Sequence, residues 1–184
     1  MIYITSDLHF CHDKEWIYQP RGFSNIYDMD SAIVYNWNKT VDINDDVYLL
    51  GDVMLNDNTR GLYLLRHLKG RIHIMIGNHD TNARIEEYRR CYNVVEVEYA
   101  TVIKYGGCNF YLSHYPTLTN FLANRKLKST LISLCGHVHT NDRFADWGDY
   151  PVYHCEVDAH NMTPVPIDKI IDDVKQRFKI GGNK

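Results

Sequence analysis

Polar residues that could bind a metal ion occur in five short groups along the chain. The groups are Asp7-Leu8-His9, Gly51-Asp52, Gly77-Asn78-His79-Asp80, Ser113-His114 and Gly136-His137-Val138-His139. Each group directly follows a short apolar run with the composition of a β-strand. In open α/β sheets, ligands bind beyond the carboxyl ends of the strands. The placement therefore predicts that the five groups converge in space, although they span more than 130 residues.

The side chains in these groups indicate which ligand they would bind. Carboxylate, amide and imidazole groups supply oxygen and nitrogen donors and no thiolate, which suits manganese, iron or zinc. The candidate ligands are Asp7, His9, Asp52, Asn78, His114, His137 and His139. Such a set is too large for one tetrahedral ion but suits two ions that share a bridging carboxylate. Two metal ions about 3.5–4 Å apart can clamp a phosphate and polarise a water molecule between them.

Taken singly, each group also has an ordinary structural explanation. Asp7 can cap a turn, Gly51-Asp52 can be a plain turn, and His114 can be a buried structural histidine. The group Gly136-His137-Val138-His139 is more specific, because alternate strand residues project the same way. The group Gly77-Asn78-His79-Asp80 is more specific still, since three different polar side chains crowd the exit of a very apolar strand. All five groups in this order favour a shared site.

The five groups together resemble the signature of the calcineurin-like metallophosphoesterase superfamily. That signature is D-x-H, then G-D, then G-N-H-D or G-N-H-E, then a lone histidine, then G-H-x-H. The resemblance implies a first ion held by Asp7, His9 and His139. It implies a second ion held by Asn78, His114 and His137. It further implies that Asp52 bridges the two ions and that His79 is catalytic, contacting the phosphate and assisting the leaving group.

Further segments resemble a small prokaryotic and phage branch of uncharacterised phosphoesterases. They are Asp7-Leu8-His9-Phe10-Cys11-His12, Arg21-Gly22-Phe23 and Val157-Asp158-Ala159-His160-Asn161. Arg21 and His12 are candidate substrate-binding residues, because a guanidinium suits bidentate capture of a phosphate and His12 adds a donor. The alternative is that Arg21 is a solvated loop residue and His12 an ordinary residue at a helix start. Asp80 is a candidate partner that orients His79, with helix capping as the alternative.

The resemblance implies hydrolysis of a phosphodiester or phosphomonoester of a small substrate by direct attack of a metal-bridging hydroxide. We expect two divalent ions, manganese first, with iron, zinc, nickel or cobalt as alternatives. One alternative function is a nuclease of the same chemistry, which would want a basic groove. Another is a non-enzymatic scaffold that retains the fold. Scaffold members resembling this superfamily have tended to lose catalytic or ligand positions, whereas the seven ligand positions and the catalytic histidine are all present here.

Hydrophobic periodicity predicts the strands and helices that carry these residues. In the first half, strands are predicted at 2–5, 47–50 and 71–76, alternating with helices at 29–41, 58–68 and 81–90. In the second half, strands are predicted at 94–100, 101–105, 108–113, 131–134 and 152–157, with helices at 117–127 and 167–178. Gly106-Gly107 predicts a hairpin, and the second half leans towards antiparallel strands. We expect a single α/β domain over 1–184, which in this superfamily is a four-layer α/β/β/α sandwich of two packed mixed sheets flanked by helices.

Composition narrows the choice of partners. The chain has 184 residues, with 20 Lys and Arg against 23 Asp and Glu, so its formal charge is −3 and a nucleic-acid partner is not expected. No apolar run approaches the roughly 20 residues needed to cross a bilayer, and the start lacks the pattern of a signal peptide. The five cysteines form no CxxC pair and are expected to be reduced and mostly buried. We expect a soluble, cytoplasmic protein with a small phosphate ester as its partner. The Tyr- and Trp-rich stretch between Asp7 and Asp52 is a candidate lining of the substrate pocket.

Overall fold

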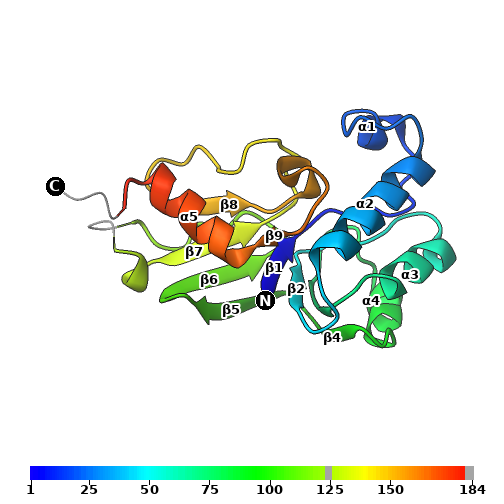
Figure 1. The fold of residues 1–184 in the computed structure, drawn as a ribbon, viewed down its shortest axis with the longest axis horizontal. Helices are drawn as coiled ribbons and strands as arrows, with labels where there is room; N and C mark the ends of the chain where they lie inside the picture. Colours follow the sequence, from blue (N-terminus) through cyan, green and yellow to red (C-terminus); the bar gives the residue numbers. More distant parts are fainter. Residues whose placement is uncertain (123–125, 181–184) are drawn as a thin grey trace.

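The first of two β-sheets is mainly parallel and contains the N-terminal strand (Figure 1). The computed structural model describes residues 1–122 and 126–180. The strand order is β4-β3-β2-β1-β9. The strands are β1 (Ile2–Thr5), β2 (Asp46–Leu49), β3 (Arg71–Met75), β4 (Val94–Glu98) and β9 (Val165–Pro166). Strands β1 to β4 run parallel, and β9 pairs antiparallel with β1.

The second sheet has the order β5-β6-β7-β8. Its strands are β5 (Ala100–Tyr105), β6 (Cys108–Ser113), β7 (Leu131–Cys135) and β8 (Val152–His154). The hairpin predicted at Gly106-Gly107 joins β5 and β6, with both glycines at positive φ. The antiparallel expectation is wrong for the other pairs, because β6–β7 and β7–β8 are parallel. The segments that follow β6 and β7 are long enough for the crossovers that parallel pairing requires.

Five α-helices accompany the sheets. They are α1 (Glu15–Tyr18), α2 (Ile26–Thr40), α3 (Asn58–Arg66), α4 (Asn82–Arg89) and α5 (Ile167–Arg177), and the 3₁₀ turns η2 (Leu127–Ser129) and η3 (Val157–His160) complete the described elements. Helices α2, α3 and α4 each begin after a residue whose side chain caps the helix N-terminus. The side chains of Asn25, Asp57 and Thr81 each accept a hydrogen bond from a backbone N–H in the first turn.

The helix predicted over 117–127 is wrong for residues 117–122, which form no helix. Residues 123–125 lie outside the described residues, and Leu127–Ser129 form a 3₁₀ turn. The Thr119 hydroxyl donates to the Leu131 carbonyl, and the Asn120 side chain accepts from the Leu131 N–H at 3.1 Å. These side chains therefore bond to the start of β7 instead of supporting a helix, a competition that Thr and Asn often win.

Two hydrophobic clusters hold the layers together. The first lies between the first sheet and helices α2 to α4, and includes Trp37, Leu49 and Tyr88. The second joins the two sheets and α5, and includes Ile4 and Leu134. Successive side chains of a strand point to opposite faces, which lets the first sheet contribute to both clusters. The predicted α/β sandwich of two packed mixed sheets flanked by helices is confirmed.

Two further observations concern the whole described chain. Over residues 1–122 and 126–180, none of the helices combines the length and the apolar character that crossing a bilayer requires. All five cysteines are free thiols in buried positions, as expected.

Candidate metal centre

The five predicted groups lie together where strands of both sheets end, and hydrogen bonds between the loops show it. The Asp7 N–H donates to the Gly51 carbonyl at 3.1 Å, which joins the exits of β1 and β2. The His79 N–H donates to Asp52 Oδ1 at 2.9 Å, which joins the exits of β2 and β3. The His137 N–H donates to Asp7 Oδ2 at 2.9 Å, so the loop after β7 reaches the loop after β1. Groups far apart in sequence therefore form one site.

The first group of candidate ligands is Asp7, His9 and His139. Oδ1 of Asp7 lies 3.7 Å from Nε2 of His9 and 3.6 Å from Nε2 of His139. Among the described residues, Asp7 Oδ1 and His9 Nε2 are buried side-chain atoms without a hydrogen-bond partner. Buried polar atoms are costly when unpaired. A cation among these three atoms would satisfy all of them, so the residues present fit a bound metal ion.

The second group is Asn78, His114 and His137. Oδ1 of Asn78 lies 2.8 Å from both His114 Nε2 and His137 Nδ1. The two ring nitrogens are 3.2 Å apart. The other ring nitrogen of His114 lies 2.8 Å from the Leu50 carbonyl, an acceptor that orients the ring. Two imidazole nitrogens and an amide oxygen thus face a common point, which is a donor set for a divalent transition metal.

Asp52 lies between the two groups. Its Oδ2 is 3.5 Å from His9 Nε2 and 3.7 Å from His114 Nε2. Burial raises the pKa of this carboxyl group, against the lowering effect of His114. Asp7, Asp52 and His114 also form a set whose ligand atoms lie within 4.8 Å of one another. One carboxylate therefore faces both groups of candidate ligands.

The charges of the first group depend on one another. Burial alone would raise the pKa of Asp7, but His9 and then His139 hold it below its usual value. Burial likewise disfavours the charged ring of His139, yet Asp158 and Asp7 raise its pKa. His9 is dominated by burial, which lowers its pKa to about 4. Metal ions bind ionised carboxylates and neutral imidazoles, so the lowered pKa values of Asp7 and His9 favour the metal-binding forms of these two side chains.

The backbone at the strand exits is unusual. Asp7, His9, Asp52, His137 and His139 all have φ between 50° and 80°. Residues other than glycine seldom adopt this left-handed region, and such residues cluster at functional sites. Positive φ angles at these residues bend the backbone sharply. Their side chains therefore point to one centre instead of to alternate faces of a strand.

Two glycines allow the loops to approach the carboxylates closely. A Cβ atom on Gly77 would lie 2.3 Å from Asp52 Oδ1, and one on Gly136 would lie 2.2 Å from Asp7 Oδ2. No side chain fits at either position.

Asp80 neither bonds to the ring of His79 nor caps a helix, the two roles expected for it. Its carboxylate accepts hydrogen bonds from the N–H groups of Asp52, Val53 and Gly77 and from the Tyr88 hydroxyl, at 2.9–3.2 Å. The N-cap of α4 is Thr81. Asp80 therefore fastens the exits of β2 and β3 to each other through their backbones.

His79 stands at the open side of the centre. Its side chain is 40% exposed, and its Nε2 lies 3.9 Å from Asp52 Oδ2. The Arg84 guanidinium donates to the His79 carbonyl at 2.7 Å and so anchors the loop. The ring is placed to contact a ligand that approaches from solvent.

His12 lies against the first group. Its ring stacks on that of His9 with centroids 5.1 Å apart, and the two Nδ1 atoms are 2.9 Å apart. Burial lowers the pKa of His12 to about 4. The ring of Trp16 in α1 meets that of His12 at 86°, with centroids 5.0 Å apart. His12 therefore belongs to the wall of the centre, between His9 and Trp16.

Arg21 is neither solvated nor free to bind a phosphate. Its Nε and Nη2 donate to the two carboxylate oxygens of Asp158 at 2.9 and 2.8 Å. Its Nη2 also donates to the Asp7 carbonyl at 2.9 Å, and its Nη1 to the Leu8 carbonyl at 3.2 Å. Protein acceptors therefore hold the guanidinium, and the alternative of a solvated loop residue is wrong. The partner of Arg21 is Asp158, 137 residues away, a contact that no local sequence pattern predicts.

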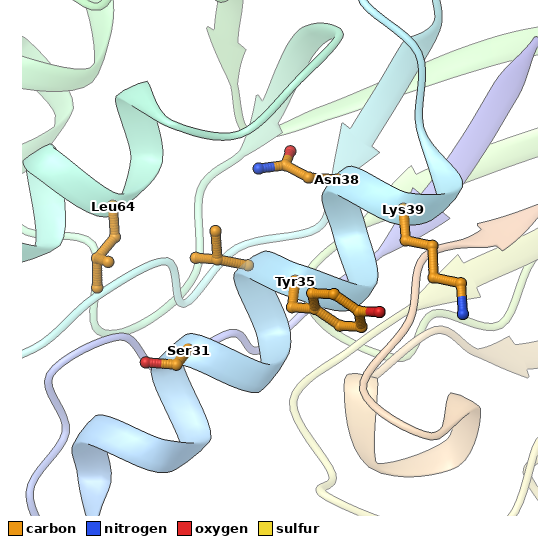
Figure 2. Close-up of a pocket in the computed structure, with 6 residues that line it drawn as sticks. Ser31, Tyr35, Asn38, Lys39 and Leu64 are labelled. Carbon is orange, nitrogen blue, oxygen red and sulfur yellow. The ribbon is translucent and has the colours of Figure 1, made fainter.

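An apolar cavity lies away from this centre. It has a volume of about 570 Å³ and is formed between α2 and α3 (Figure 2). It is lined by Ser31, Val34, Tyr35, Asn38, Lys39 and Leu64. None of these is a predicted site residue, so the cavity and the polar centre are separate features.

The chain was compared with family models and with solved structures. No protein-family model matches the chain. The solved structure of the protein of unknown function AQ665 from Aquifex aeolicus matches with a TM-score of 0.69 and 23% identity, over 94% of this chain and 98% of that one. The two proteins therefore share a fold. A phosphoesterase from E. coli, Yfce, matches with a TM-score of 0.49 and 12% identity, over 84% and 77% of the two chains.

One curated relative is similar in sequence. The uncharacterized protein MJ1445 of Methanocaldococcus jannaschii is 32% identical over 179 residues, which covers 92% of this chain and 89% of the relative. At this identity and coverage, the chain belongs to the same family as MJ1445.

Proposed function

We propose that the protein is a metal-dependent phosphoesterase of the calcineurin-like metallophosphoesterase superfamily, in its small prokaryotic and phage branch. It would hydrolyse a phosphodiester or phosphomonoester of a small substrate. The observation that carries the proposal is the position of Asp52, whose Oδ2 faces His9 of the first ligand group and His114 of the second. A single carboxylate between two sets of donors is the arrangement that a pair of divalent ions requires.

In this proposal each ligand group holds one ion. The first ion takes Asp7, His9 and His139, the second takes Asn78, His114 and His137, and Asp52 serves both. Manganese is the first candidate for the pair, given donors that are oxygen and imidazole nitrogen. When bound, the two ions supply an activated water and offset the negative charge of the phosphate.

The chain's own side chains then complete the reaction. Asp52 and Asp7 are each fixed through one oxygen by a backbone N–H, so the other oxygen keeps its direction. His79 is exposed on the open side, where its Nε2 can donate a hydrogen bond to a phosphoryl oxygen and a proton to the leaving group. Cys11, the thiol beside His12, is no nucleophile, because burial raises its pKa to about 11. Water therefore attacks phosphorus directly, without a covalent intermediate.

Two exposed aromatic side chains support a substrate with an organic group. Trp16 is 65% exposed and touches His12. Tyr115 is 50% exposed and touches His137 and His114, with ring centroids 4.7 and 5.0 Å apart. Aromatic faces at the margin of a polar site suit an apolar or planar ester group. A nuclease has less support, since Arg21, the guanidinium beside the first group, is buried in a pair with Asp158.

The proposal is tested by metal removal and one substitution. Protein treated with a chelator should lose activity on bis-p-nitrophenyl phosphate and regain it with Mn²⁺. Asp52→Asn should abolish that activity, because the amide removes the charge that serves both ions. Asp46→Asn is the matched control, since Asp46 begins β2, the strand that Asp52 follows, and pairs with Arg71. Full activity after exhaustive chelation, or an active Asp52→Asn protein, would exclude the proposed chemistry.

A further inference from the structure

A buried ion pair lies against the first ligand group. The side chains of Arg21 and Asp158 are only 1% and 13% exposed, and two nearly parallel hydrogen bonds of 2.9 and 2.8 Å join them. The two residues are 137 positions apart in the sequence. Burying both charges is expensive unless the remaining polar atoms are satisfied. The groups that this ion pair contacts therefore indicate its role.

Arg21 holds the backbone of the first metal-binding loop. Its Nη2 donates to the Asp7 carbonyl and its Nη1 to the Leu8 carbonyl. Asp7 has a φ of 56°, a strained conformation that directs its carboxylate to the centre. A strained residue persists only where its surroundings fix it. The guanidinium supplies that restraint from outside the ligand group.

Asp158 faces the opposite side of a ligand imidazole. Its Oδ2 lies 3.5 Å from Nδ1 of His139, while Nε2 of the same ring lies 3.6 Å from Asp7 Oδ1. Because the Arg21–Asp158 pair occupies the Nδ1 side of this ring, it fixes the ring with Nε2 turned towards Asp7. Arg21 Nη2 lies 3.4 Å from the same Nδ1 and fixes Asp158 beside it. The pair therefore contacts both His139 and the loop that carries Asp7 and His9.

The second ligand group has no such link. Within the described part of the chain, the hydrogen bonds and ion pairs of Arg21 and Asp158 involve none of Asn78, His114 and His137. Any effect of the pair on metal binding should therefore be confined to one of two ions.

We propose that Arg21 and Asp158 are positioning residues that set the metal affinity of the Asp7, His9 and His139 group, and that Arg21 does not bind substrate. This inference rests on the proposed function, because it requires an ion in that group. In this proposal Arg21 orients metal ligands, whereas the sequence alone led us to expect that it binds the phosphate of the substrate.

Calorimetric titration with Mn²⁺ of chelator-treated protein tests the inference. Wild-type protein should bind two ions. In Asp158→Asn and Arg21→Lys, the affinity for one ion should fall on the order of 10- to 100-fold, as for other residues that support metal ligands. The affinity for the other ion should stay unchanged. With both ions loaded at high Mn²⁺, KM for bis-p-nitrophenyl phosphate should match the wild-type value, because Arg21 does not touch the substrate.

Asp173→Asn is the matched control. Asp173 is a buried carboxylate that pairs with Arg143 and Lys169 and accepts from the Tyr153 hydroxyl, and none of these is a candidate ligand. It should lower the melting temperature and leave both Mn²⁺ affinities unchanged. If Asp158→Asn fails to fold, Asp158→Glu keeps the charge and should restore folding with a weakened first site.

The outcomes separate the two proposals. Wild-type protein that binds no Mn²⁺ would overturn both. Wild-type protein that binds two ions, with affinities that do not change in the variants or that fall equally for both ions, would overturn only the positioning role. A raised KM in fully loaded Arg21→Lys would return Arg21 to the substrate site.

Discussion

At the scale of single residues, the two central carboxylates divide their oxygens in the same way. Asp7 and Asp52 each accept a backbone N–H of another loop with one oxygen, at 2.9 Å in both cases. Each turns its second oxygen towards the imidazoles of the centre. The carboxylates thus join loops and present ligand atoms at once, which explains why a substitution at either should disturb both folding of the loops and metal binding.

His79 differs from the candidate ligands, because its side chain is 40% exposed and its hydrogen bond to Asp52 comes from the backbone N–H. His79→Ala should therefore leave the bound metal content nearly unchanged and lower kcat by about 10²–10³-fold, the typical contribution of an acid or an electrostatic donor. Metal analysis and kinetics on the same preparation measure both quantities.

His73→Ala provides the control for this variant. His73 lies in β3, the strand that leads to His79, but pairs with Asp46 and Glu96. It should keep its activity. Loss of one metal equivalent in His79→Ala would show that His79 is a ligand instead.

Among the elements, the loops that leave the strands position the candidate ligands more directly than the strands do. Side chains along a regular strand point alternately to its two faces. After β1, β2 and β7, the positive φ angles of Asp7, Asp52 and His137 turn these side chains towards one centre. Gly77 and Gly136 permit the close contact of neighbouring exits. Helix α1 adds an aromatic side chain beside this edge, since its Trp16 packs on His12.

Trp16→Ala tests whether α1 contributes to substrate binding. Loss of one aromatic contact costs about 0.5–1.5 kcal/mol, so KM for bis-p-nitrophenyl phosphate should rise about 2- to 10-fold while kcat changes little. Trp147→Ala is the control, because Trp147 is also a partly exposed tryptophan but lies in the loop before β8. Equal KM values in both variants and the wild type would remove Trp16 from the substrate site.

At the scale of the whole molecule, the centre joins the two sheets. Asp7, Asp52 and Asn78 follow strands of the first sheet, and His114 and His137 follow strands of the second. In Figure 1, helices α2, α3 and α4 lie on one side of the molecule and α5 lies on the other. A metal ion bound by residues of both sheets should therefore stabilise the fold as a unit.

Mn²⁺ should accordingly raise the melting temperature of the wild-type protein. A ligand at 100 times its Kd adds about 2.7 kcal/mol to the free energy of unfolding, which is roughly 5–11 °C for a chain of this size. Asp52→Asn should show a much smaller rise, because both ions depend on its carboxylate. Differential scanning calorimetry with and without Mn²⁺ gives the two shifts, and equal shifts would contradict a shared carboxylate.

Local patterns were enough to predict much of this protein. The apolar runs predicted the strands, including β1, β3 and β6, because alternation and β-branched composition are properties of a few neighbouring residues. The polar groups after those runs predicted which side chains meet, since strand ends share an edge of the sheet. These local patterns predicted the α/β sandwich and the residues that gather where its strands end.

Contacts between distant segments decided the rest. The direction of β7 and the loss of the helix expected at 117–122 depend on where the chain crosses over and on bonds from Thr119 and Asn120 to Leu131. The place of Arg21 depends on Asp158, which is 137 residues away. Whether a charged side chain meets water or a buried partner is a property of the folded surface and not of its neighbours in sequence. For that reason the burial of Arg21 against Asp158 could be seen only in the tertiary structure.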